Sequence, residues 1–160
     1  MVGSVTSPHS LCPYLAVKGA QAAIDFYVQA LGATVDFKLI DPSDGRIGHA
    51  ELLFGTTRIF IADEYPDFGA VGPETLGGSP VKFHLQVADA DAFVAHAVRH
   101  GATSLRAVKL EFHGDRTGLI ADPFGYSWFI ASKAEDVSAQ EMQRRWDAMA
   151  APALDLGSPP

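Results

Sequence analysis

The chain has 160 residues, of which 48% are hydrophobic and 10% aromatic, enough for the core of one domain and unlike a disordered chain. Its formal net charge of −7 disfavours binding to nucleic acid or to an anionic membrane. A single cysteine, Cys12, excludes an intramolecular disulfide and is compatible with a reducing compartment. Neither a signal peptide nor a membrane helix is evident, so we expect a cytoplasmic protein.

The first half of the chain predicts a strand, a helix and three further strands. The segment "PYLAVKGAQAAIDFYVQALGA" begins with an alternating strand that ends at Val17. An amphipathic helix follows, and Gly32 is placed where a helix end favours a left-handed residue. Turn signals then separate three strand-like runs, at 34–41, 46–54 and 57–63.

The second half repeats this order. The segment "FHLQVADADAFVAHAVRHGA" contains a strand that ends at Val87, a helix, and the pair Gly101 and Ala102. Strand-like runs follow at 103–108, 109–122 and 126–132. The sequence therefore predicts an α+β fold made of two βαβββ modules.

Segments of different composition connect and follow these modules. The stretch 64–80 is rich in Pro and Gly and has no periodicity, which is typical of a linker or a lid loop. After the last strand, Ser138 and Glu141 have the spacing of a helix capping box. We predict a first module at 10–63, the linker or lid at 64–80, a second module at 81–133, a C-terminal helix at 134–149 and a flexible tail at 150–160.

Three motifs carry a resemblance to a known family. They are "HAELLFGTTRIFIADE", "GDRTG" leading into "DPFGYSW", and "EDVSAQEMQRR". Together with the repeat, they resemble the PhnB-like branch of the vicinal oxygen chelate superfamily, which includes glyoxalase I, extradiol dioxygenases and bleomycin-resistance proteins. The resemblance implies a curved, cup-shaped mixed sheet that holds one ligand. It also implies a homodimer, because many members are dimers.

The metalloenzymes of that superfamily bind a divalent metal through His or Glu on the first and last strands of each module. The matching positions here are Cys12, Lys82, Phe129 and the apolar run 59–61. An ammonium group and an aromatic ring are not suitable metal ligands, and a thiolate needs partners of matching geometry. We therefore predict no metal and no cofactor at this site.

Strand alternation indicates what replaces the metal site. Lys82, His84 and Gln86 share one face of their strand, and this face has the parity of the lost ligand position. An apolar wall with a few polar groups is typical of a pocket for an organic ligand. The predicted ligand-binding pocket consists of Cys12, Tyr14, Lys82, His84, Gln86, Phe129, His49, Glu51 and Arg116.

Several of these residues have a second interpretation. A relocated metal site would need His49, Glu51, His84, Glu111 and His113 to converge; otherwise they are polar groups that satisfy loop backbone. Arg116 either pairs with Asp115 or binds an anionic ligand group. Cys12 is either a small packing residue or a nucleophile activated by Lys82 or His84.

The segment 111–132 combines these chemical groups with structural signals. Gly114 predicts a bulge or a close approach of backbone, and "DPFG" predicts a type I turn. Trp128 has the parity opposite to Phe129 and is expected in the core.

Three functions remain open at this point. We expect first a protein that binds a small organic molecule in the cup or in a dimer groove, without the usual metal. The second is a metal-dependent lyase, isomerase, dioxygenase or transferase of the same superfamily with relocated ligands. The third is an assembly or regulatory module with no ligand in the cavity. Net charge disfavours nucleic acid and membrane partners for all three.

Overall fold

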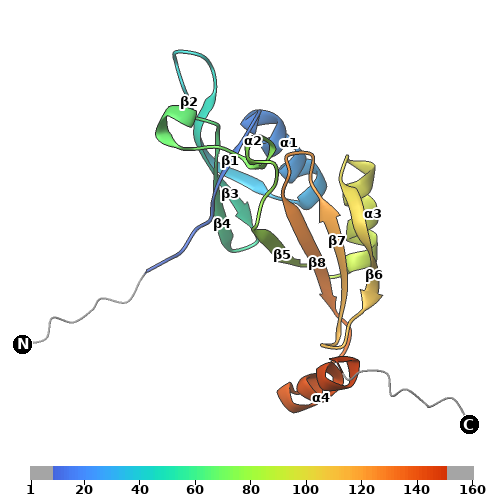
Figure 1. The fold of residues 1–160 in the computed structure, drawn as a ribbon. Coiled ribbons are helices and arrows are strands. Elements are labelled where there is room, and N and C mark those ends of the chain that lie inside the picture. Colours follow the sequence, from blue (N-terminus) through green and yellow to red (C-terminus); the bar gives the residue numbers. More distant parts are fainter. Residues whose placement is uncertain (1–8, 151–160) are drawn as a thin grey trace, which may run out of the picture.

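The computed structural model describes residues 9–150 and consists of two βαβββ modules followed by a helix (Figure 1). The predicted α+β class is confirmed; of the predicted tail at 150–160, residue 150 ends a helix and residues 151–160 lie outside the described residues. The first module contains β1 (Tyr14–Val17), α1 (Ala20–Leu31), β2 (Thr34–Ile40), β3 (Ile47–Phe54) and β4 (Thr57–Asp63). The second contains β5 (Lys82–Gln86), α3 (Ala90–Arg99), β6 (Thr103–Leu110), β7 (Asp115–Ala121) and β8 (Ser127–Lys133).

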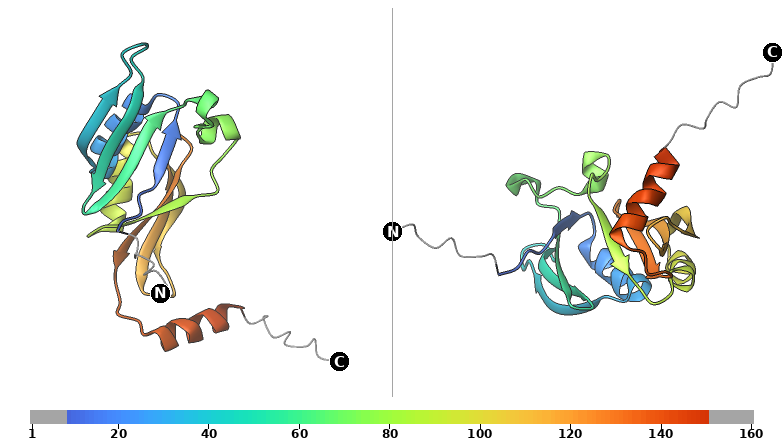
Figure 2. Two further views of the ribbon diagram at one scale, coloured as in Figure 1. Left: turned by 90° about the vertical axis from the view of Figure 1, so that its left-hand side faces the viewer. Right: turned by 90° about the horizontal axis from the view of Figure 1, so that it is seen from below.

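Each module forms one four-stranded mixed sheet. The strand orders are β1-β4-β3-β2 and β5-β8-β7-β6, so the two sheets have the same topology. The pairs β1–β4 and β5–β8 are parallel, and all other pairs are antiparallel. Helix α1 packs on the first sheet and α3 on the second, which leaves the opposite face of each sheet uncovered by either helix (Figure 2). We call this the inner face.

The core lies between the helices and the sheets and continues from one module to the other. Helices α1 and α3 contact each other, and the ring of Tyr27 on α1 lies 5.5 Å from the ring of Trp128 on β8. Phe54 of β3 also contacts Trp128, with 5.4 Å between ring centroids. Trp128 is 2% exposed, so the prediction that it belongs to the core is confirmed. These aromatic contacts hold the two modules together.

One buried carboxylate joins the turn 122–125 to both modules. Asp122 Oδ1 accepts the backbone N–H groups of Phe124 and Tyr126, each at 2.9 Å. Its Oδ2 accepts the hydroxyl of Tyr27 at 2.7 Å and the indole N–H of Trp128 at 2.9 Å. Burial, with the charge of Asp122, raises the pKa of Tyr27 well above its usual value, so this hydroxyl remains a donor.

The loop between β6 and β7 differs from the prediction. The sequence predicted one strand over 109–122, but residues 109–110 end β6 and residues 111–114 form a turn. The amide of Gly114 donates to the carbonyl of Glu111 at 3.0 Å, and Gly114 has φ +95°. The carbonyl of Gly114 accepts the amides of Ala134 and Glu135, so the predicted close approach of backbone is confirmed.

The segment 64–80 contains two short helical elements, η1 (Pro66–Phe68) and α2 (Pro73–Leu76). The carboxylate of Glu64 accepts the amide of Gly72 at 2.6 Å and the hydroxyl of Thr75 at 2.9 Å. Gly72 packs directly on β1, because a Cβ there would lie 2.4 Å from the carbonyl oxygen of Ala16. The segment is therefore held by packing of Gly72 on β1 and by the hydrogen bonds of Glu64 within the segment.

Helix α4 (Ala139–Ala150) lies beyond the end of the second sheet (Figures 1 and 2), where it contacts Phe112 of the turn 111–114. The hydroxyl of Ser138 accepts the amide of Glu141 at 3.2 Å, so Ser138 caps this helix as its spacing predicted. No residue of α4 is buried. No helix within residues 9–150 is long and apolar enough to cross a membrane.

The ion pairs of α4 predict a response to acid. Hydrogen bonds from Arg144 and Arg145 lower the pKa of Glu141 from 4.5 to about 2. Because the folded pKa is lower, these pairs stabilise α4 fully above pH 4.5 and are lost as the pH falls towards about 2. We expect the fluorescence of Trp146 to report this loosening, and Glu141→Gln to abolish the transition. A transition unchanged in Glu141→Gln would assign it to other carboxylates.

Candidate functional site

The inner face of the first module carries a row of four residues, three of them aromatic, that crosses all four strands. The strand register aligns Tyr14 of β1 with Phe60 of β4, Phe60 with Glu51 of β3, and Glu51 with Phe37 of β2. Tyr14 and Phe37 are exposed in the single chain. Their side chains reach this face because alternate residues of a strand point to opposite sides of the sheet. The result is an open aromatic surface beside polar groups.

The polar groups on this face form a connected chain of contacts. The hydroxyl of Tyr14 lies 2.7 Å from His49 Nδ1, and His49 Nε2 lies 3.4 Å from Glu51 Oε1. Glu51 also forms a close ion pair with Arg58, which in turn lies 3.0 Å from Asp36. Partial burial raises the pKa of Tyr14. The carboxylate of Glu51 is thus paired with the guanidinium of Arg58 in the same chain.

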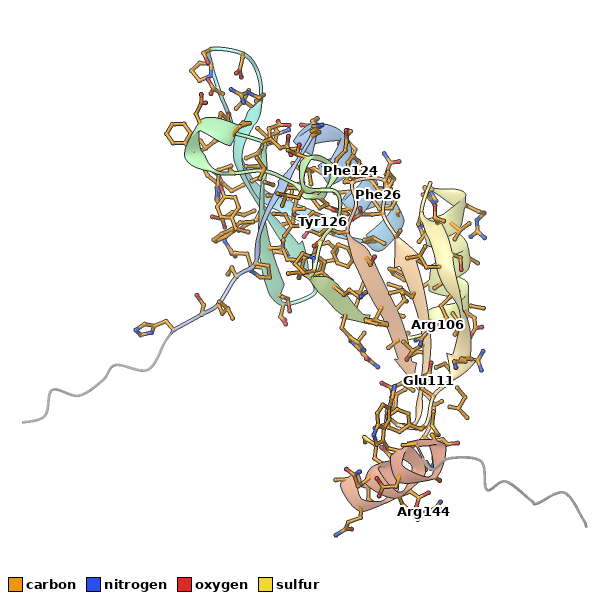
Figure 3. All side chains as sticks on the ribbon, in the orientation of Figure 1. Phe26, Arg106, Glu111, Phe124, Tyr126 and Arg144 are labelled. Carbon is orange, nitrogen blue, oxygen red and sulfur yellow. The ribbon has the colours of Figure 1, made fainter. Side chains whose placement is uncertain are left out.

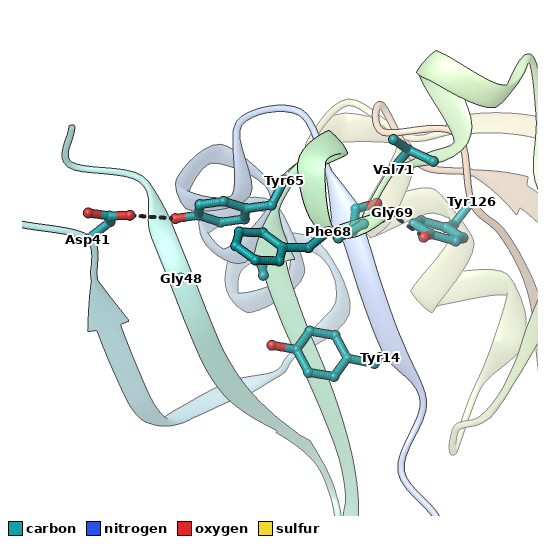
Figure 4. A pocket seen from close by; sticks show the side chains of 11 residues that line it. Tyr14, Asp41, Gly48, Tyr65, Phe68, Gly69, Val71 and Tyr126 are labelled. Carbon is teal, nitrogen blue, oxygen red and sulfur yellow. Dashed lines mark hydrogen bonds between the residues drawn. The ribbon is translucent and has the colours of Figure 1, made fainter. Parts of the chain in front are cut away.

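A cavity of about 670 Å³ lies beside this row, between the first sheet and the segment 65–71 (Figure 4). Its wall includes four aromatic side chains, several small residues and one carboxylate, that of Asp41. Tyr126, from the turn before β8, closes one side, and its hydroxyl donates to the carbonyl of Ala16 at 3.2 Å. The lining residues are Tyr14, Ala16, Asp41, Gly48, Ala62, Tyr65, Phe68, Gly69, Ala70, Val71 and Tyr126.

Asp41 and Tyr65 shape the far wall of this cavity. The hydroxyl of Tyr65 donates to Asp41 Oδ2 at 3.2 Å (Figure 4). The guanidinium of Arg46 lies 3.9 Å from the centroid of the Tyr65 ring. Hydrogen bonds from the hydroxyl and amide of Ser43 lower the pKa of Asp41, so it is ionised at neutral pH. The cavity therefore combines aromatic surface with one fixed negative charge.

Sequence reasoning named only Tyr14 among the residues that line this cavity. It missed Tyr65 and Phe68 because the segment 64–80, interpreted as a linker or a lid loop, has no periodicity that would assign its side chains to a wall. The available signal was the presence of two aromatic residues in a loop rich in Gly and Pro. It missed Tyr126 because that residue, at the start of the predicted strand 126–132, was assigned to no face.

The inner face of the second module contains most of the other predicted pocket residues. The register aligns His84 with Phe129, Phe129 with Leu119, and Leu119 with Arg106. Lys82 lies two residues before His84 and Gln86 two residues after it, on the same face of β5, and both are exposed. A cavity of about 460 Å³ lies on this face, and His84 and Phe129 line it.

The single chain does not bring the predicted pocket residues into one cavity. Tyr14 lines the cavity of the first module, whereas His84 and Phe129 line that of the second. Cys12 and Glu51 line a third cavity with Arg58, and Gln86 lines a fourth with His84. Cys12 therefore does not share a cavity with Lys82 or His84, the two residues considered as activators of its thiol.

Arg116 corrects two predictions at once. Its guanidinium donates to both carboxylate oxygens of Asp91 on α3, at 2.7 and 2.9 Å. It thus belongs to the helix side of the second sheet, away from the inner face, and it does not line any of the cavities described above. The expected ion pair with Asp115 is also wrong, since the contact of Asp115 is with His113 at 3.9 Å.

The residues at the superfamily's metal positions do not fit a divalent cation. The positions on β5 and β8 are Lys82 and Phe129. Both lie on the inner face, where Phe129 is aligned with His84, and neither side chain is a suitable metal ligand. Within residues 9–150, no three His, Cys, Asp or Glu side chains are close enough to hold a metal. The alternative set of His49, Glu51, His84, Glu111 and His113 therefore does not converge in this chain.

Known proteins resemble this chain in sequence and in fold. Residues 7–130 match the family model of the glyoxalase/bleomycin resistance protein/dioxygenase superfamily. The uncharacterized protein Rv0887c of Mycobacterium tuberculosis is 37% identical over 137 residues, covering 84% of this chain and 80% of that protein. The uncharacterized protein At5g48480 of Arabidopsis thaliana is 32% identical over 119 residues, covering 69% of this chain and 70% of that protein.

Solved structures agree with these sequence matches. The crystal structure of the Arabidopsis thaliana protein superposes with a TM-score of 0.64 at 26% identity, covering 81% of this chain and all of that one. The fosfomycin resistance protein FosX of Listeria monocytogenes superposes with a TM-score of 0.63 at 12% identity, covering 86% and 99% of the two chains, a likeness of fold alone. By the family model and the repeated βαβββ sheet, the chain belongs to the glyoxalase/bleomycin resistance protein/dioxygenase superfamily.

Proposed function

We propose that the protein binds a small organic molecule in the cavity between its first sheet and the segment 65–71. The observation that carries the proposal is the lining of this cavity of about 670 Å³ by Tyr14, Tyr65, Phe68 and Tyr126. A volume of roughly 300–1,000 Å³ with aromatic walls and few polar groups is typical of small-molecule sites. The proposal includes no metal, because the residues at the metal positions do not fit one.

The chemistry of the lining favours a planar ligand that is cationic or amphipathic. Aromatic side chains bind flat rings by offset or edge contacts and attract cations to their faces. Asp41 is the only charged residue in the wall, and its pKa is lowered, so it presents a negative charge at neutral pH. The net charge of −7 adds a field of the same sign.

The wider setting of this function is also a proposal. The exposed inner-face residues Tyr14, Phe37 and Leu39 favour a homodimer that covers them, since such apolar patches commonly mark interfaces. The motifs "HAELLFGTTRIFIADE" and "EDVSAQEMQRR" favour the PhnB-like branch of the superfamily. The single cysteine supports a cytoplasmic location.

Titration with 9-aminoacridine, a planar aromatic cation, tests the proposal. We expect saturable binding by fluorescence, with a dissociation constant below about 1 mM. Phe68→Ala should weaken binding about 2–10-fold, since an aromatic contact contributes roughly 0.5–1.5 kcal/mol. Phe68 is 86% exposed, so this substitution leaves the core intact. Leu76→Ala is the matched control, because Leu76 is an exposed apolar residue of the same segment outside the cavity wall.

Two results would contradict the proposed site. Equal weakening by Phe68→Ala and Leu76→Ala would show adhesion to the outside of the segment. The absence of saturable binding by the unmodified protein would remove the cavity as a site for such ligands. Asp41→Asn separates charge from shape: it should weaken the cationic probe and leave neutral acridine bound as before.

A further inference from the structure

A second chamber lies at the other end of the molecule, where the second sheet meets α4. It is the cavity of about 460 Å³ on the inner face of β6, β7 and β8, closed at one end by the turn 111–114 and by Trp146 of α4. Figure 3 shows Arg106 and Glu111 at this end of the sheet, above the helix that carries Arg144. None of the residues that line it also lines the cavity of the first module.

Two buried polar atoms of this chamber lack a hydrogen-bond partner. They are Thr117 Oγ1 and Glu111 Oε1, and Thr117 as a whole is only 4% exposed. Arg106 Nη2 lies 3.2 Å from Glu111 Oε1, close enough for an ion pair, but this contact does not have hydrogen-bond geometry. An unsatisfied buried polar group costs about 1–3 kcal/mol, so such atoms usually have a partner. A ligand that donates a hydrogen bond would supply one.

The charge of the chamber is opposite to that of the whole chain. Arg106 and Lys109 both lie near the carboxylate of Glu111, at 3.2 and 3.8 Å. Two cations and one carboxylate in this part of the wall leave a net positive charge. A cationic ligand is therefore disfavoured here, and a neutral or anionic one is favoured.

Aromatic side chains form the remaining walls. The guanidinium of Arg106 lies 5.7 Å from the centroid of Phe129, and the rings of Phe112 and Trp146 are 5.1 Å apart. Phe112, Phe129 and Trp146 all line the chamber. These walls suit a planar ring, with the polar atoms of Glu111 and Thr117 available at one side.

Helix α4 closes the chamber through few contacts. Arg145 donates to the carbonyl of Phe112 at 3.2 Å and to Glu135 at 2.9 Å, and Trp146 packs on Phe112. Trp146 is 52% exposed, although it forms part of the wall. Arg145 and Trp146 therefore place α4 over this end of the chamber.

We propose that this chamber is a second ligand site, for a planar aromatic molecule that is neutral or anionic and carries an O–H or N–H donor. The donor binds Glu111 or Thr117, a negative group on the ligand faces Arg106 and Lys109, and Trp146 of α4 covers the ring. The site is distinct from the cavity proposed above and takes a ligand of opposite charge preference.

The probe is 6-hydroxy-2-naphthoate, which is planar and anionic and carries an O–H donor, and the reporter is the ¹H–¹⁵N spectrum of the full chain. The chain has two tryptophans, Trp128 in the core and Trp146 in the chamber wall, so two indole N–H signals serve as internal control and reporter. Trp146→Phe assigns them. We expect the Trp146 signal to shift with probe and the Trp128 signal to stay in place.

Matched probes and variants separate hydrogen bonding from apolar adhesion. The analogue 6-methoxy-2-naphthoate lacks the donor and should bind about tenfold more weakly, the factor that corresponds to about 1.4 kcal/mol for a hydrogen bond to a polar or charged acceptor. Thr117→Val, which preserves side-chain shape, and Glu111→Gln should each reduce this preference for the hydroxy probe. Both are compared with Thr34→Val, a change at an exposed threonine of β2 that does not line the chamber.

Three outcomes would overturn this inference. The first is no shift of Trp146 at millimolar probe, and the second is equal affinity for the two naphthoates in every variant. The third is a Trp146 shift that follows protein concentration instead of probe, which would show that a second copy of the chain covers the chamber. Shifts confined to Gly48 and Gly69 would place the probe in the first cavity and leave the proposed function standing without a second site.

Discussion

Replacing Asp122 with alanine is expected to destabilise the protein by about 3–5 kcal/mol, the range seen when a buried, multiply bonded charge is removed. Asp122 is 6% exposed and accepts four hydrogen bonds. Two come from the turn that follows it, and two from Tyr27 and Trp128, which belong to different modules. Its loss leaves these donors without an acceptor and disconnects the modules at one point. Urea unfolding measures the effect.

Two variants calibrate this result. Tyr27→Phe removes one of the four hydrogen bonds and should cost about 1–2 kcal/mol. Asp136→Ala removes an exposed carboxylate that pairs with Lys133, and it should leave the stability close to that of the unmodified protein. An Asp122→Ala protein as stable as Asp136→Ala would show that the turn and the module junction do not depend on this carboxylate.

Replacing Gly114 with alanine is expected to cost about 2–4 kcal/mol, which combines backbone strain with overpacking. The φ of Gly114 is +95°, a conformation that residues with a Cβ rarely adopt. The added Cβ would lie 2.6 Å from Val137 Cγ2 and 2.7 Å from the carbonyl oxygen of Glu135. The chain 134–137 must therefore move away from the turn, and α4 moves with it. Urea unfolding measures the stability, and Trp146 fluorescence reports the helix.

Gly45→Ala is the matched control for this substitution. Gly45 has φ +79°, and nothing lies within 4 Å of a Cβ built there, so alanine meets the strain without the contact. It should cost about 1–2 kcal/mol and leave Trp146 fluorescence unchanged. If both variants lost the same stability and kept the same fluorescence, the contact between Gly114 and the chain before α4 would contribute neither to stability nor to the position of α4.

Much of the fold could be predicted from local sequence. Gly32 ends α1 with φ +71°, and Ser138 caps α4, as their residue types and positions predicted. The alternation in β5 placed Phe83 and Leu85 against the core and Lys82, His84 and Gln86 on the other face. These features depend on neighbours within a few residues, which is why one sequence suffices to find them.

The turn 111–114 could not be predicted in the same way. Glu111, Phe112 and His113 continue an alternating pattern, so the local signal was that of a strand. The strand ends because Gly114 turns back to Glu111 and its carbonyl binds residues 134 and 135, which follow β8. That partner lies some twenty residues further along the chain, outside any local window.

Long-range pairing likewise decided the site. Arg116 found Asp91 on α3 in place of its neighbour Asp115, because the α3 residue lies across from it on the helix side of the sheet. Tyr65 and Phe68 became cavity walls only when Glu64 fixed the segment by binding Gly72 and Thr75. Such contacts depend on the position of the whole chain and leave little trace in hydrophobic periodicity.

The sequence by itself determined the repeat, the α+β class and the alternation that separates the two faces of β5. Each follows from residue type and from the fixed periods of helix and strand, whereas the metal positions were identified through the resemblance to the superfamily. Only the tertiary structure decided that the inner faces carry separate cavities and that α4 closes one of them. Cavities are the spaces between segments distant in sequence, so their shape is set by packing.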